Sequence, residues 1–185
     1  MSKVNLSSNF DDVVLDYLEF CEIEKNLSQN TIKMYHFYLT DFGQWSKNFL
    51  KKDTFTIGNI NDDIVREYRI NLNRRISSKS NLEFKRSTQK TFLVALRAFL
   101  KYLVVEKGIE ILPPEKVILG KSEDRVPKVL NAQQIKKLFE VQNLDKKSGI
   151  RDKAIIETLY STGLRVSELV ALNRDEINLD TGEFT

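Results

Sequence analysis

The feature that most constrains the fold is a set of four apolar stripes at helical spacing between Phe10 and Glu106. Side chains three or four residues apart share one face of an α-helix, so each stripe predicts an amphipathic helix that packs against the others. We expect these helices over 10–24, from 28 past 45, from 61 or 62 through 72, and over 87–106. The apolar positions that define them are Phe10, Val13, Val14, Tyr17, Leu18 and Cys21, then Ile32, Tyr35, Leu39 and Phe42, then Ile64, Val65, Tyr68 and Leu72, and last Phe92, Leu93, Leu96, Phe99, Leu100 and Leu103.

A proline-marked segment follows the fourth helix and predicts a boundary between two domains. Residues 111–128 contain all three prolines of the chain together with a glycine and several charges. This composition is typical of a linker and not of a packed element. We therefore divide the chain into a helical domain over 1–110, a linker over 111–128 and a second domain over 129–185.

The second domain is expected to contain helices followed by the start of a sheet. Asn131 suits the N-cap of a short helix through Gln142, and a longer helix is expected to begin at Arg151. Residues 177–185 predict a strand, an Asp-Thr-Gly turn and the start of a second strand. Because a sheet with a barely begun second strand cannot complete a domain, we interpret the chain as truncated after Thr185.

A helix–glycine–helix segment over 151–170 contains the most distinctive candidate site. Gly163 follows a periodic apolar run, as helix C-caps commonly do, and a second helix is expected to start around Arg165. A cation at a helix N-terminus is mildly disfavoured unless an anion joins it, because the free N–H groups there already carry partial positive charge. Arg165 therefore indicates an anionic ligand, and Glu168, one turn on, can hold its guanidinium. The residues alone leave a second interpretation open, an exposed ion pair worth well under about 1 kcal/mol.

Basic residues are concentrated in the middle of the chain. The net charge is only +3, but residues 74–101 contain eight basic residues and one acidic residue. Four of the basic residues fall on one narrow face of the helix expected over 87–106. This basic stripe consists of Arg86, Lys90, Arg97 and Lys101. Such a stripe is typical of contact with nucleic-acid phosphates, with an ordinary solvated surface as the alternative.

Several classes of protein are excluded by what the sequence lacks. No apolar run approaches the roughly 18–20 residues that a membrane helix needs, and the N-terminus lacks the apolar core of a signal peptide. The single cysteine, Cys21, excludes an internal disulfide, and His36 is the only histidine. We find no metal-spaced cluster, phosphate-binding Walker loop or glycine-rich dinucleotide turn. The sequence thus predicts a cytoplasmic protein without a metal or small-molecule cofactor.

Three motifs in the chain resemble those of one enzyme family. Residues 161–169, Ser-Thr-Gly-Leu-Arg-Val-Ser-Glu-Leu, resemble the first catalytic-arginine motif of the tyrosine recombinases (the phage-integrase family), most closely the Xer-type subfamily. Residues 27–32, with Tyr35, are similar to the start of the family's core-binding domain, and residues 96–103 provide the third match. The motifs follow the family's order of helical domain, linker and catalytic domain.

The resemblance implies both a fold and an activity. The fold would be a four-helix SAM-like core-binding domain, a linker and the N-terminal part of an α+β catalytic domain. The activity would be site-specific DNA recombination through a 3′-phosphotyrosine intermediate, on double-stranded sites, by a tetramer of this protein alone or with a paralogue. Chromosome dimer resolution is the role that we expect. Integration or excision of a mobile element, and non-catalytic DNA binding on the same scaffold, remain alternatives.

The resemblance also assigns roles to residues. Arg165 would be the first catalytic arginine, supported by Glu168, and Thr31 would join the basic stripe in contacting DNA. The family's catalytic lysine, His-x-x-Arg helix, later His/Trp and nucleophilic tyrosine would all lie beyond Thr185, so the chain is expected to bind DNA at most and to cleave nothing. The connection over 77–87 is expected to be mobile or ordered only by a partner. A specificity loop and a simple tether are the two alternatives for its part over 77–86.

Overall fold

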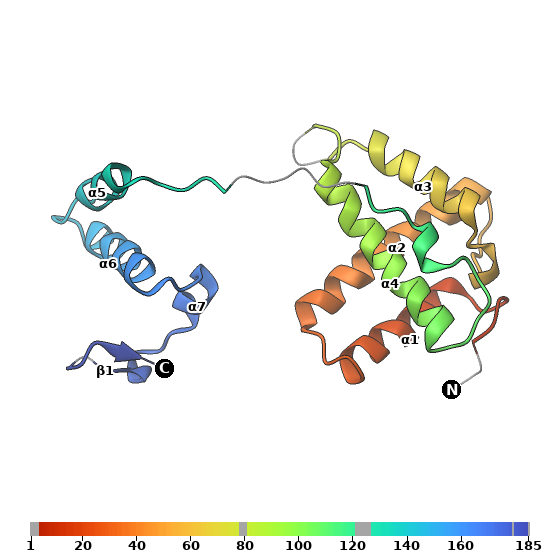
Figure 1. Cartoon of the computed structure of the whole chain (residues 1–185), viewed down its shortest axis with the longest axis horizontal. Helices are drawn as coiled ribbons and strands as arrows, with labels where there is room; N and C mark the ends of the chain where they lie inside the picture. Colours follow the sequence, from red (N-terminus) through yellow and green to blue (C-terminus); the bar gives the residue numbers. More distant parts are fainter. Residues whose placement is uncertain (1–3, 78–80, 121–126, 179, 185) are drawn as a thin grey trace. The chain divides into compact units, whose positions relative to one another are not determined.

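The computed structural model describes residues 4–77, 81–120, 127–178 and 180–184, and the chain forms two compact units, Met1–Asp124 and Arg125–Thr185 (Figure 1). The described residues are mostly helical, which confirms the predicted fold class. The finer limits of 1–110, 111–128 and 129–185 remain a proposal.

The first unit is built on the four helices that the apolar stripes predict. They are α1 (Phe10–Ile23), α2 (Gln29–Leu50), α3 (Asp62–Arg74) and α4 (Arg86–Val105). Asn9, Ser28 and Asn61 cap the first three, each accepting a hydrogen bond from a backbone N–H of the first turn. The helix α4 contacts the other three, so its apolar face lies at the centre of the core (Figure 1).

A short segment after α4, predicted as part of the linker, is instead packed on the first unit. Residues Pro114–Lys116 form a single 3₁₀ turn, η2, that contacts α4. Pro114 is buried, and Val117 is completely buried within the core. The expectation that 111–128 contains no packed element is therefore wrong for this part, because composition does not report which apolar side chains pack against α4.

The connection between α3 and α4 is joined to the rest of the first unit by hydrogen bonds at its ends. Arg75 Nη1 donates to Asp41 Oδ1 at 2.6 Å, and Tyr68 Oη donates to the other carboxylate oxygen at 2.7 Å. Burial raises the pKa of the Tyr68 phenol, which keeps it a donor. The Phe84 N–H donates to the carbonyl of Arg75 at 2.9 Å. The expectation that the connection is mobile or ordered only by a partner stays a prediction, and residues 78–80 lie outside the described residues.

The second unit contains α5 (Ala132–Glu140), α6 (Lys147–Thr162), α7 (Val166–Ala171), the 3₁₀ turn η3 (Arg174–Glu176), and strands β1 (Ile177–Asn178) and β2 (Glu183–Phe184). Asn131 caps α5 and β1 pairs with β2 in antiparallel register, both as predicted. The helix α6 begins four residues before the predicted Arg151. Gly149 lies in the first turn of α6 although glycine has a low helix propensity. A glycine is required at this position because a Cβ would lie 1.9 Å from the carbonyl oxygen of Asn143.

Candidate nucleic-acid interface

The break between α6 and α7 places Arg165 at the start of a helix. Gly163 has a φ of +71°, in the left-handed region that glycine adopts without strain, and its N–H donates to the carbonyl of Leu159 at 3.0 Å. The chain turns there, and Arg165 becomes the N-cap residue of α7 in an extended conformation. The predicted helix–glycine–helix arrangement is thus confirmed.

Glu168 holds Arg165 through two hydrogen bonds. One carboxylate oxygen, Oε2, accepts from the backbone N–H of Arg165 at 2.8 Å, and the other, Oε1, accepts from its Nη1 at 2.7 Å. The carboxylate thereby satisfies a free donor at the start of α7 and fixes one edge of the guanidinium. The Arg165 side chain is 82% exposed, so its remaining donors are open to an incoming anion.

The same two hydrogen bonds lower the pKa of Glu168 below its ordinary value of 4.5, the backbone N–H contributing more than the guanidinium. In an Arg165→Gln variant we expect this pKa to rise only part of the way to 4.5, because the backbone donor remains. Since the folded-state pKa is lowered, these bonds favour the ordered start of α7 above pH 4.5 and are lost as the pH falls through the lowered pKa. NMR titration of the Glu168 carboxyl carbon measures the shift, and an unchanged pKa would contradict a role for the guanidinium.

The basic stripe lies on α4 as predicted, but its members border two different hollows. Arg86 and Lys90, near the start of α4, line a pocket that is shared with α3. Arg97 and Lys101 line a second groove between α4 and the segment around η2. In the described parts of the chain, none of the four forms an ion pair. Their charges are therefore available to a partner.

Thr31 lies in the first turn of α2, on a different helix from the basic stripe. Its hydroxyl is 3.0 Å from the Ser28 hydroxyl, and its backbone N–H donates to Ser28 Oγ at 3.3 Å. The half-buried side chain thus takes part in the cap of α2. Its predicted contact with DNA stays a prediction.

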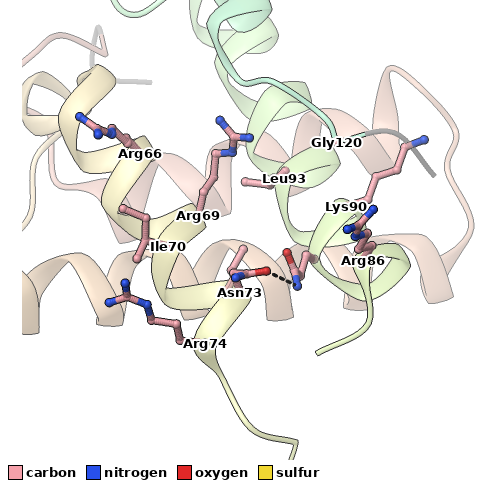
Figure 2. A pocket seen from close by; sticks show the side chains of 11 residues that line it. Arg66, Arg69, Ile70, Asn73, Arg74, Arg86, Lys90, Leu93 and Gly120 are labelled. Atoms are coloured by element: carbon pink, nitrogen blue, oxygen red, sulfur yellow. Dashed lines mark hydrogen bonds between the residues drawn. The ribbon is translucent and has the colours of Figure 1, made fainter. Parts of the chain in front are cut away.

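The structure adds basic residues on α3 that sequence reasoning missed. Arg66, Arg69 and Arg74 of α3 line one pocket together with Arg86 and Lys90 of α4. In Figure 2 the Arg69 side chain extends between the two helices, whereas those of Arg66 and Arg74 extend from α3 away from α4. The signal was present in the sequence, because Arg66 and Arg69 are three residues apart on α3 and neither belongs to its apolar stripe. It was overlooked because residues 66–69 lie outside the strongly basic stretch over 74–101.

Two stretches of the chain match known protein families. Residues 14–107 match the family described as Phage integrase, N-terminal SAM-like domain, and residues 128–185 match the Phage integrase family. The first match alone covers half of the chain. The chain belongs to the tyrosine recombinase (phage integrase) family.

Individual tyrosine recombinases match along most of this chain. Tyrosine recombinase XerC of Bacillus subtilis (strain 168) is 34% identical over 175 residues, which are 92% of this chain and 53% of the relative. Tyrosine recombinase XerD of Pasteurella multocida (strain Pm70) is 36% identical over 160 residues, which are 86% of this chain and 50% of the relative. This tyrosine recombinase chain thus spans about half the length of the curated relatives it matches.

No feature of the described residues points to a metal or a membrane. Among them, no three His, Cys, Asp or Glu side chains gather as metal ligands would. No helix in the described part of the chain is long and apolar enough to cross a membrane.

Proposed function

We propose that this chain provides the DNA-binding domain and the first catalytic arginine of a site-specific recombinase, which cleaves and rejoins DNA strands through a 3′-phosphotyrosine. The observation that carries the proposal is the Arg165–Glu168 pair at the start of α7, in a chain of the tyrosine recombinase family. Neither a metal nor a nucleotide cofactor is needed, because the phosphotyrosine bond conserves the energy of the phosphodiester.

Arg165 acts on the charge that develops during strand cleavage. A guanidinium presents donors in a planar fork that matches two non-bridging phosphate oxygens. Donors fixed before the reaction stabilise the transition state without a cost of reorganisation. The two hydrogen bonds from Glu168 supply that fixation, since they hold both the backbone and the guanidinium of Arg165. Glu168 is therefore a positioning residue in this proposal.

The basic stripe of α4 contacts the DNA backbone. Replacing Lys90, Arg97 and Lys101 by Ala should weaken binding to duplex DNA and reduce its salt dependence. For each phosphate that the variant no longer binds, the slope of log K against log salt concentration should fall by about 0.9. Fluorescence anisotropy with a labelled duplex over a salt series measures the slope. An unaltered slope would show that the basic stripe is solvated surface, and that α4 does not bind DNA.

Chromosome dimer resolution in the cytoplasm, by a tetramer that this protein forms on DNA alone or with a paralogue, is the biological role that we propose. It is supported by the relatives, which are named tyrosine recombinases XerC and XerD. Integration of a mobile element, by the same strand-exchange chemistry, is the alternative biological role. Sequencing the DNA that the enzyme joins in cells separates them, because an integrase would join an element to a new position in the chromosome.

A further inference from the structure

We propose that the pocket between α3 and α4 binds the phosphodiester backbone of duplex DNA, as an extension of the surface formed by the basic stripe. The inference rests on the proposed function and adds to it residues of α3, a helix with no predicted role in DNA binding. We define this α3–α4 pocket by its basic residues, which are Arg66, Arg69, Arg74, Arg86 and Lys90.

The α3–α4 pocket is a formed hollow and not an accidental gathering of long side chains. Its floor includes Leu72 and Leu93, both buried in the core, so the two helices are fixed relative to each other. Gln89 Nε2 donates to Asn73 Oδ1 at 3.3 Å and links α4 to α3 across it (Figure 2). The pocket has a volume of about 520 Å³. Because a water molecule occupies roughly 30 Å³ of liquid, a phosphate can enter with part of its hydration shell.

The charge of the α3–α4 pocket favours an anionic ligand. Five cationic side chains line it, and no acidic residue is among its described lining residues. None of the five forms an ion pair within the described parts of the chain. Like charges around one hollow create a positive potential that attracts an anion, and four of the five are arginines, whose forked donors suit phosphate oxygens.

Continuity with the basic stripe favours a DNA backbone over a free phosphate. Arg86 and Lys90 belong both to the basic stripe and to the α3–α4 pocket. A strand whose phosphates contact this end of α4 therefore passes the pocket, where Arg69 extends from α3 toward α4 (Figure 2). A single small phosphate would use only part of the five positive charges. A polyanion can use all of them, because successive phosphates enter and leave the pocket along one strand.

The test is a salt titration of DNA binding by an Arg66→Gln/Arg69→Gln variant of the full chain. Because binding to the DNA backbone does not depend on sequence, a labelled duplex of arbitrary sequence serves as the probe. We expect the slope of log K against log salt concentration to fall by roughly two, and the affinity to fall on the order of tenfold or more at about 0.1 M salt. Circular dichroism and the thermal midpoint confirm that the variant is folded, which the exposed or half-buried positions of both arginines favour.

Two further variants make the outcome decisive. Lys52→Gln/Lys116→Gln removes the same charge at two exposed positions that line neither hollow of α4, so its slope should stay near that of the unchanged protein. Arg66→Lys/Arg69→Lys keeps the charge and should retain most of the slope while losing part of the affinity. If the Arg→Gln variant changes no more than the Lys52/Lys116 control, the inference is overturned.

The failure of this inference can be told apart from failure of the proposed function. An Arg97→Ala/Lys101→Ala variant changes only the part of the basic stripe outside the α3–α4 pocket. If this variant lowers the slope and the Arg66/Arg69 variant does not, DNA binding stands and the pocket has no part in it. If neither variant lowers the slope, the proposal that α4 binds DNA fails as well. Inorganic phosphate, added at constant ionic strength, should compete weakly; if it binds the pocket and duplex DNA does not, the inference is also overturned.

Discussion

Arg165→Lys, introduced into a protein of the relatives' full length that carries this chain, is expected to lower the rate of strand cleavage by about 10²–10³. Lysine keeps the positive charge but lacks the planar fork, so it cannot donate to two phosphate oxygens while Glu168 holds its other edge. The measurement is the yield of covalent protein–DNA complex on a nicked duplex, resolved on a denaturing gel. DNA affinity should change little, because the basic stripe and not Arg165 supplies most of the phosphate-binding groups in this proposal.

A matched control separates the role of Arg165 from a general effect of replacing an exposed arginine. Arg174 is also exposed and lies only nine positions further along, in η3, with no ion pair in the described parts of the chain. Arg174→Lys should therefore leave the yield unchanged. Glu168→Gln should reduce it by less than Arg165→Lys, because the amide can still accept a hydrogen bond from the backbone N–H of Arg165. An unchanged yield in Arg165→Lys would sink its assignment as a catalytic residue.

The helices α2 and α3 of the first unit were predictable because each is specified twice. Apolar spacing gives the buried face, and a polar residue before the first turn gives the start, as Ser28 does for α2 and Asn61 does for α3. The start of α4 was placed one residue late, at Ser87, because Lys85 provides no side-chain cap that would mark it. Local signals thus define a helix well where periodicity and capping agree.

Contacts between distant residues could not be predicted in the same way. Arg75 looks like one more charge in a basic stretch, yet it pairs with Asp41 of α2, 34 residues earlier. Val117 looks like part of a proline-rich linker, yet it is completely buried. Both depend on which surfaces meet after folding, and a single sequence does not report that. The pocket lined by the arginines of α3 could not be predicted for the same reason, because α4 forms its other side.

The geometry of the candidate site at Arg165 was predictable from the sequence, but the function of the residue was not. Spacing alone predicted the pair with Glu168, and the structure contains it at 2.7 Å. An exposed pair of this kind has the same geometry whether it binds a phosphate or only solvent. Membership of the family favours the first alternative, and we therefore propose a DNA phosphate as the partner of Arg165. Geometry and family are therefore separate supports for the same residue.

Phe10→Ala is expected to destabilise the first unit by about 3–5 kcal/mol, the usual cost of deleting a large buried aromatic side chain. Phe10 is completely buried, and its ring centroid lies 5.7 Å from that of Phe42, 5.3 Å from Phe55 and 5.4 Å from Phe99. The truncation leaves a cavity where α1, α2, α4 and the segment before η1 (Ile57–Asn59) meet, and those rings cannot collapse without moving their helices. Urea unfolding followed by circular dichroism measures the decrease in the free energy of unfolding.

Phe37→Ala is the matched control, because it makes the same truncation within a helix at a side chain that is 58% exposed. Phe37 contacts Tyr38 and Phe92 at its edge, at centroid distances of 5.5 and 6.0 Å, so its removal exposes little new surface and should cost well under half as much. Equal destabilisation of the two variants would contradict a core centred on Phe10. A large destabilisation confined to Phe10→Ala should also weaken DNA binding, because the basic stripe keeps its spacing only while α4 is packed on α1 and α2.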